Sequence, residues 1–142
     1  MTHLLDTDTL SIWQSGTGIE HANLVRNLAA HPTADVGVSI ISFHEQTLGA
    51  HAYVNRARTG ADLVRGYELF EQARHWFGQL VVVPFDDPAA AVFDNLRALN
   101  LRIGTMDLRI AAITLSRDLT LVTRNVAHFG RVPGLRTEDW TQ

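Results

Sequence analysis

The sequence contains no cysteine and no lysine among its 142 residues. The absence of cysteine excludes disulfide bonds and zinc sites built on thiolates. The absence of lysine excludes any chemistry that depends on a lysine amine, and all twelve basic residues are arginines. With a net charge of −3, the chain as a whole has no general attraction for nucleic acid.

Long hydrophobic runs are missing too. The chain does not begin with a basic region followed by an apolar stretch, so no secretion signal is evident. No apolar run approaches the roughly 20 residues that a membrane span needs. We therefore expect a cytoplasmic protein without membrane segments. The length, with 46% hydrophobic and 19% charged residues, is typical of one soluble domain over residues 1–142.

Apolar, β-branched stretches alternate with segments of helical periodicity. Strands are predicted at 3–7, 35–41, 79–85 and 119–123, with a short edge strand before Trp140. The valine run in 79–85 is typical of a strand that is buried on both faces. Helices are predicted at 9–14, 20–30, 42–55, 61–77, 87–100 and 107–117. This alternation predicts an α/β protein, a three-layer α/β/α sandwich with a mainly parallel central sheet.

Polar side chains follow the predicted strands. In sheets of this kind, functional groups collect outside the carboxyl ends of the strands. The residues at or near these positions are Asp6, Asp8, Glu45, Asp107, Thr123 and Asn125. We therefore expect them to lie at one edge of the sheet.

Helix capping offers a simpler explanation for most of these residues. Ser42 and Glu45 match the capping box, in which a serine caps the helix and a glutamate returns the bond. Asp107 lies in a predicted first turn, where a carboxylate is favoured by the helix dipole. Asp8 is a plausible N-cap. Asp6, at the end of an apolar strand, is the one residue for which a cap is not expected.

A shared position changes the interpretation. Several carboxylates held together repel one another, and their pKa values rise unless a cation neutralises them. Oxygen ligands without cysteine select hard cations such as Mg²⁺ or Mn²⁺. The sequence therefore suggests a divalent metal site.

Four segments together carry a family resemblance. They are LLDT at 4–7, SIISFHEQTLG at 39–49, IGTMDLRIAA at 103–112 and LVTRNVAHFGRVPGLRTEDW at 121–140. In this order they resemble the PIN-domain nucleases, and among them the VapC-type toxin ribonucleases of bacterial toxin–antitoxin pairs. The resemblance covers essentially the whole chain.

The resemblance implies a metal-dependent endoribonuclease toxin that hydrolyses RNA phosphodiesters with bound Mg²⁺ or Mn²⁺. Asp6, Glu45 and Asp107 match the family's three core acidic positions, as metal ligands or, for Glu45, as a base. Asn125 stands where the family often has a fourth aspartate, and Thr123 matches a supporting hydroxyl.

The resemblance also bears on Asp8 and on partners. Asp8 stands where the family often has asparagine or serine, so we expect it to cap the following turn or to support the site. The expected partners are a cognate antitoxin and a second copy of the chain, in a homodimer or a higher assembly.

Arginine, histidine and aromatic residues are further candidates. Arginines near the motifs suit phosphate contacts, although each taken alone is expected to be a surface residue; they are Arg102, Arg109, Arg124 and Arg131. His44 and His128 are expected to be packing or surface residues rather than general acids, and the general-acid role stays open for His128 because the fourth position is not acidic. Aromatic side chains for an antitoxin groove or a dimer face are Trp13, Tyr53, Phe70, Trp76 and Phe77, with Phe70 expected in the core.

Two other functions are compatible with parts of the sequence. LLDTDT loosely resembles the start of the haloacid-dehalogenase phosphatases, but that family relies on a lysine, which this chain lacks. A catalytically weak or inactive PIN fold that only binds RNA or a partner protein is the stronger alternative, because Asn125 contributes no charge at the fourth position.

Overall fold

The computed structural model describes residues 1–142, with a five-stranded parallel sheet at its centre. The strands are β1 (His3–Leu5), β2 (Val36–Ser39), β3 (Val81–Val83), β4 (Thr120–Val122) and β5 (Arg136–Glu138). Their order is β3-β2-β1-β4-β5, and every neighbouring pair is parallel. The first strand of the chain is thus the central one, and Leu4 lies opposite both Gly37 and Leu121.

Seven α-helices and one short 3₁₀ helix connect or follow the strands. The helices are α1 (Thr7–Ser15), α2 (Ile19–Ala29), α3 (Ile40–Arg56), α4 (Gly60–Gln79), α5 (Asp87–Arg97), α6 (Thr105–Ser116) and α7 (Val126–Phe129), and the 3₁₀ helix η1 spans Thr33–Asp35. The predicted fold class is confirmed, whereas α7 and η1 were not predicted. None of the helices combines the length and hydropathy that a membrane span requires.

The two faces of the sheet carry separate cores because successive side chains of a strand point to opposite sides. Leu4 and Leu121 belong to a cluster formed with α5, α6 and α7. Leu5 and Val122, one residue further along, belong to a second cluster with residues of α1, α2 and α4. This alternation produces the three layers of the sandwich.

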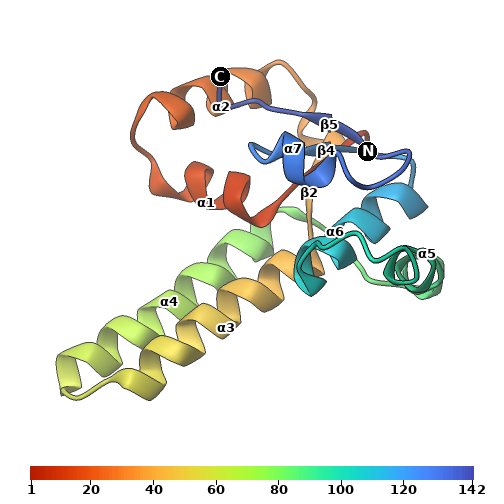
Figure 1. The fold of residues 1–142 in the computed structure, drawn as a ribbon. Coiled ribbons are helices and arrows are strands. Elements are labelled where there is room, and N and C mark those ends of the chain that lie inside the picture. Colours follow the sequence, from red (N-terminus) through yellow and green to blue (C-terminus); the bar gives the residue numbers. More distant parts are fainter.

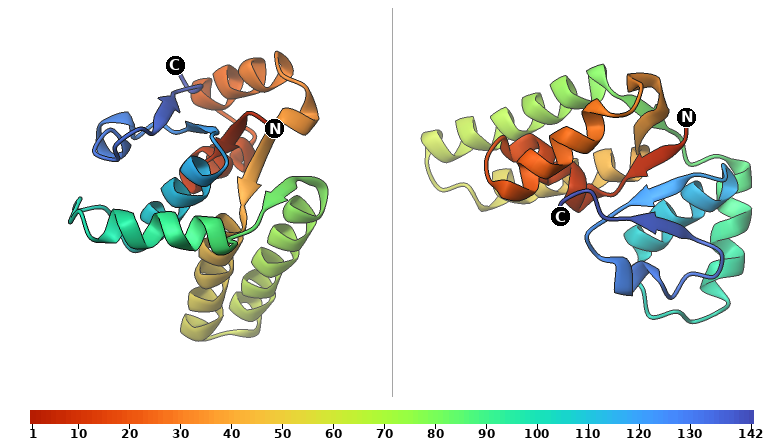
Figure 2. Two further views of the ribbon diagram at one scale, coloured as in Figure 1. Left: turned by 90° about the vertical axis from the view of Figure 1, so that its right-hand side faces the viewer. Right: turned by 90° about the horizontal axis from the view of Figure 1, so that it is seen from above.

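The α3–α4 hairpin projects from the body of the protein, as Figure 1 and the left view of Figure 2 show. The two helices pack closely along its length. A β-carbon on Gly66 of α4 would come within 2.6 Å of the Val54 Cγ2 atom on α3. Gly66 therefore permits a separation between these helices that a larger residue would prevent.

Two sequence predictions about buried residues are wrong. β3 is an edge strand, and Val81 is 42% exposed, so the valine run is not buried on both faces. Phe70 is only partly buried on α4, because the hairpin extends beyond the sheet and has no third layer to cover it. Phe77, nearer the sheet, is buried in the core.

Candidate active site

A depression of about 310 Å³ brings together the acidic residues that follow the strands. It is lined by Asp6, Thr7, Asp8, Ser11, Glu45, Asp107, Asn125 and Phe129. Four of these eight residues are acidic, and none is basic. The chain therefore concentrates negative charge at one place, although its net charge is only −3.

Asp6 is both the residue that follows β1 and the N-cap of α1. Its Oδ1 atom accepts a hydrogen bond of 2.8 Å from the backbone N–H of Thr9. The prediction that Asp8 caps this helix, and that Asp6 does not, is wrong. The helix begins directly after the strand, at Thr7, so the cap is two residues earlier than expected.

Burial dominates the electrostatics of Asp6, whose exposed fraction is 5%. Loss of solvation raises the pKa of this carboxyl above its ordinary value, and the nearby charge of Asp8 adds to the effect. Hydrogen bonding from Thr123 and Thr9 lowers the pKa and opposes the shift. Asp6 is therefore a largely buried carboxylate that is stabilised by neutral donors and has no paired cation in the protein.

Glu45 lies in the second turn of α3 and is not part of a capping box. The helix begins at Ile40, and its N-cap is Ser39, whose hydroxyl accepts from the backbone N–H of Ser42. The prediction that Ser42 caps the helix with Glu45 is wrong, because the helix starts three residues earlier than that motif requires. The capping explanation for Glu45 is thereby removed.

Two hydroxyl groups form a hydrogen-bonded chain that ends at Glu45. Thr7 Oγ1 donates to Glu45 Oε1 at 2.6 Å, and Ser42 Oγ lies 2.8 Å from the same threonine oxygen. Burial raises the pKa of Glu45, and the negative charges of Asp107 and Asp6 raise it further. The negative charges of Asp6 and Asp107 therefore act directly on Glu45.

Asp107 lies in the first turn of α6, as predicted, and has a histidine partner. His128 Nε2 on α7 is 3.2 Å from Asp107 Oδ2. His128 also packs edge-on against Phe129, with ring centroids 5.3 Å apart. His128 is thus more than the packing or surface residue predicted from the sequence, whereas His44 is exposed as expected.

Thr123 and Asn125 follow β4 at the same edge of the sheet. Thr123 is fully buried, and its hydroxyl accepts a 2.9 Å bond from the backbone N–H of Asn125. Asn125 is the N-cap residue of α7, but its side chain makes no capping bond and lines the depression. Its amide is therefore free of a local structural task.

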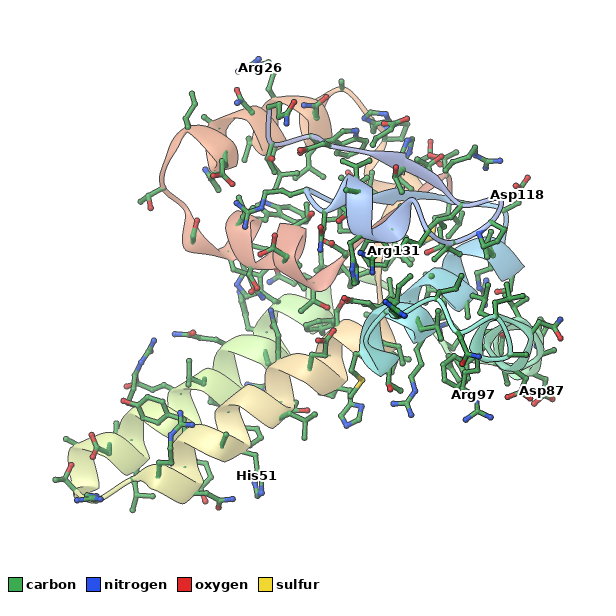
Figure 3. All side chains as sticks on the ribbon, viewed as in Figure 1. Arg26, His51, Asp87, Arg97, Asp118 and Arg131 are labelled. Carbon is green, nitrogen blue, oxygen red and sulfur yellow. The ribbon has the colours of Figure 1, made fainter.

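The four arginines proposed for phosphate contacts do not line the depression. Arg124 is the nearest in sequence to the site, and its guanidinium is bound by Asp8 at 2.8 Å and Glu20 at 2.5 Å. Arg131 donates to the carbonyl of Arg102, and Figure 3 shows it beside α7. Arg109 lies 5.6 Å from the centre of the Phe93 ring.

The donor set of the depression suits a hard divalent cation. Its charged lining residues are all carboxylates, and its neutral lining includes amide and hydroxyl oxygens. Burial, and then repulsion by neighbouring carboxylates, raises the pKa values of Asp6 and Glu45, and a bound cation would relieve both costs. No three acidic or histidine side chains stand close enough to share one ion in the present arrangement.

A larger groove of about 590 Å³ lies between α1 and the α3–α4 hairpin. It contains no carboxylate and is lined by Gln14, Gln46, Gly49, Ala50, Leu69, Gln72, Ala73 and Trp76. Trp76 makes an edge-to-face contact with Trp13, with ring centroids 5.3 Å apart. This groove has the composition of a contact surface and lacks the groups needed for hydrolysis.

Comparison with known proteins connects this arrangement to characterised relatives. No protein-family model matches the chain. A tRNA(fMet)-specific endonuclease VapC from Salmonella typhimurium is 33% identical over 141 residues, which cover 96% of each protein. Ribonuclease VapC2 from Haemophilus influenzae is 36% identical over 69 residues, covering 46% of this chain and 52% of the relative.

Solved structures share the fold over the full length. DNA-bound VapBC from Salmonella typhimurium has a chain that is 27% identical, with a TM-score of 0.74 and coverage of 99% of this chain and 98% of that one. VapBC-1 from nontypeable Haemophilus influenzae has a TM-score of 0.77 at 20% identity and full coverage of both chains, a likeness of fold alone.

Proposed function

The chain belongs to the VapC family of ribonucleases, and from that premise we propose that its acidic depression is a divalent-metal site for RNA hydrolysis. The observation that carries the proposal is the convergence of three carboxylates from separate helices on one depression. Asp6 caps α1, Glu45 lies in the second turn of α3, and Asp107 lies in the first turn of α6. Helix capping does not explain this set, because Glu45 lies beyond the first turn of its helix and caps nothing.

We assign the metal-binding role first to Asp6 and Asp107, with Glu45 as a third ligand or a base. Asp6 is fixed by the start of α1 and by burial, so it holds one side of the site in place. Asn125 contributes a carbonyl oxygen without charge. The donor types favour Mg²⁺ or Mn²⁺ over softer metals.

A cation of this kind supplies positive charge against the scissile phosphate and lowers the pKa of water, so that a nucleophile forms near neutral pH. The residues of the chain provide its placement. Asp6, directly after the central strand, and Asp107, in the first turn of α6, would offer it carboxylate oxygens, and Glu45 as a base would receive the proton of the attacking water. The raised pKa of Glu45 suits this second role, because a general base works best when its pKa approaches the working pH.

We propose RNA as the substrate, and structured RNA of the transfer type as the first class to test. The Salmonella relative is named for cleavage of tRNA(fMet). This chain has no arginine in the depression itself, so contacts to phosphates must come from the surrounding surface, where Arg124 and Arg131 lie within the motif that follows β4.

We also propose that the chain is the toxin of a toxin–antitoxin pair and assembles with a cognate antitoxin. The related solved structures are VapBC complexes. In this chain the groove beside Trp76 is a suitable seat for an antitoxin segment, because it joins apolar and amide side chains next to α1 and α3. A second copy of the chain is the further partner expected in a larger assembly.

The decisive experiment combines RNA cleavage with metal binding. Purified protein, freed of antitoxin, is incubated with a panel of tRNAs and other RNAs after EDTA treatment, and again with added Mg²⁺ or Mn²⁺. We expect cleavage only with added metal and none from Asp6→Asn. Free Mn²⁺, counted by electron paramagnetic resonance, gives the dissociation constant independently of activity.

A matched control is Asp94→Asn, which removes an exposed carboxylate from α5 away from the depression. Asp94→Asn should bind Mn²⁺ and cleave RNA like the unmodified protein. Equal cleavage by Asp6→Asn and the unmodified protein would contradict the assignment of the site. Metal and RNA binding without any cleavage would instead favour the inactive PIN fold as a binding module.

A further inference from the structure

Glu45 is held by a chain of two hydroxyl groups that connects three parts of the site. Thr7, the first residue of α1, donates its hydroxyl proton to Glu45 Oε1 at 2.6 Å. Ser42, one turn before Glu45 on α3, has its hydroxyl oxygen 2.8 Å from Thr7 Oγ1. Thr7 directly follows Asp6, so this contact connects the segment that carries one acidic residue to the helix that carries another.

The direction of this chain follows from the number of protons available. A threonine hydroxyl has one proton to donate and two lone pairs that can accept. Because Thr7 gives its proton to the ionised Glu45, it can only accept at its contact with Ser42. Ser42 is therefore the donor, and the order of donation is Ser42 to Thr7 to Glu45.

Burial of Ser42 keeps this order of donation in place. Ser42 is completely buried, so its hydroxyl cannot exchange this partner for bulk water. Hydrogen bonds in such a chain polarise one another, which strengthens the terminal bond to the carboxylate. At the other end, Glu45 Oε2 receives no hydrogen bond from the protein. One oxygen of Glu45 is occupied and the other is available.

We propose that Ser42 and Thr7 are positioning residues that act as a hydroxyl relay, holding Glu45 by Oε1 so that Oε2 is the oxygen used at the metal and substrate site. The inference rests on the proposed function of the depression and adds two residues to it. Neither residue touches the reacting atoms. Their effect on chemistry is transmitted through Glu45.

The relay also restricts how α1 and α3 move relative to each other. Asp6 is anchored to α1 by its capping bond to Thr9, and Thr7 attaches the same turn to Glu45. Hydrogen-bonding partners that orient a metal ligand typically change metal affinity or activity by about 10–100-fold when they are removed. A loss at Thr7 should fall in this range, with a smaller loss at Ser42.

The test uses the full chain, with Mn²⁺ as the probe. Thr7→Val removes the donor with little change of shape, and Thr7→Ser keeps the hydroxyl. We expect Thr7→Val to weaken Mn²⁺ binding by about tenfold, and Thr7→Ser to bind within about twofold of the unmodified protein. Thr47→Val is the control, because Thr47 lies on the same helix and bonds only to the carbonyl of His44.

A double-mutant cycle separates a relay from two independent contacts. Ser42→Ala should weaken Mn²⁺ binding several-fold in the unmodified background and have no further effect when Thr7→Val is present. Thermal unfolding of each variant reports whether it folds. If Thr7→Val does not fold, the test uses the two single variants Ser42→Ala and Thr7→Ser. Additive effects of the two substitutions would overturn the relay. So would equally weak Mn²⁺ binding by Thr7→Ser and Thr7→Val.

Failure of the relay is distinguishable from failure of the metal site itself. If Asp6→Asn loses Mn²⁺ binding while Thr7→Val and Ser42→Ala retain it, the metal site stands and the relay is wrong. If Asp6→Asn and the unmodified protein bind Mn²⁺ equally, both proposals are wrong.

Discussion

The backbone N–H of Thr9 donates to Asp6 Oδ1 at 2.8 Å, so the carboxylate that follows the central strand also caps the first helix. One residue thereby has a structural and a proposed chemical role. The two roles make different demands, because capping needs an acceptor oxygen whereas metal binding needs the negative charge as well.

Asparagine and alanine at position 6 should separate these roles. Asparagine is as good an N-cap as aspartate, and loss of a cap costs about 0.5–2 kcal/mol. We expect Asp6→Asn to be at least as stable as the unmodified protein without metal at pH 7, and Asp6→Ala to be less stable than Asp6→Asn by about 1 kcal/mol. Urea unfolding measures both. Equal stability of the two variants would show that the capping bond contributes little.

In the metal-free protein, the contribution of Asp6 and Glu45 to stability should fall as the pH rises through their titration in the folded state. Both pKa values are raised by burial, so the folded state binds more protons than the unfolded state between the two pKa values of each group. Their contribution is fully present below about pH 4, where the unfolded carboxyls titrate, and is lost as the pH rises through the raised pKa values of the folded state.

This pH dependence is measured as a difference between proteins. The double variant Asp6→Asn, Glu45→Gln removes both groups and leaves the other carboxyls in place. Its stability relative to the unmodified protein should increase from pH 4 to pH 7 in urea unfolding with EDTA present. A constant difference would mean that neither group titrates differently in the folded and unfolded states.

Arg124 should contribute to stability in a salt-dependent way. It joins Asp8 of α1 and Glu20 of α2 to the loop after β4, and its side chain is 42% exposed. Exposed ion pairs contribute up to about 1 kcal/mol, so we expect Arg124→Gln to lower the free energy of unfolding by that amount or less at low salt. The loss should largely disappear at 1 M salt, where screening acts within about 3 Å.

Arg74→Gln is the comparison for this measurement. Arg74 pairs with Glu71 three residues before it on the same helix, and both side chains are more than two-thirds exposed. Its removal should change stability less than that of Arg124, which connects segments over 100 residues apart. A larger effect for Arg74 would contradict the bridging role of Arg124.

Asn125→Asp should tighten divalent-cation binding and destabilise the metal-free protein. The substitution adds a fourth core carboxylate to the lining of a depression that already holds Asp6, Glu45 and Asp107. Affinity in such sites follows the number of charged ligands, and we expect Mn²⁺ to bind roughly tenfold more tightly. Urea unfolding with EDTA should show the opposite sign, because the added charge has no cation to offset it.

Asn95→Asp on the exposed surface of α5 controls for the change in net charge. It should alter neither Mn²⁺ binding nor the free energy of unfolding to a comparable extent. Unchanged Mn²⁺ affinity of Asn125→Asp would show that this position does not contact the ion.

The sequence was sufficient to predict the fold class and the position of the acidic cluster. Apolar strands and helical periodicity are local patterns, and parallel strands direct their carboxyl ends to one edge. Caps were harder, because Asp6 and Ser39 are caps only if the helices start at Thr7 and Ile40. The predicted caps, Asp8 and Ser42, lie two and three residues further along the chain, and a shift of that size reassigns the cap.

Features set by distant parts of the chain could not be predicted. Nothing local to the valines of β3 indicates an edge strand, because strand order depends on how the whole sheet assembles. The contact between Thr7 and Glu45 joins residues 38 positions apart. Their hydroxyl and carboxylate were visible in the sequence, but a hydrogen bond between them depends on how α1 and α3 pack.

The placement of β1 in the middle of the sheet also governs the order in which the protein matures. Its register pairs His3 with Thr120 and Leu5 with Val122. The central strand therefore cannot complete its pairing until residues more than 100 positions later have been synthesised. During synthesis the amino-terminal part emerges first, and long-range pairing of this kind is slow. Asp107 and Asn125 also emerge late. A nascent chain on the ribosome is therefore expected to remain unable to cut RNA until nearly all of it has been translated.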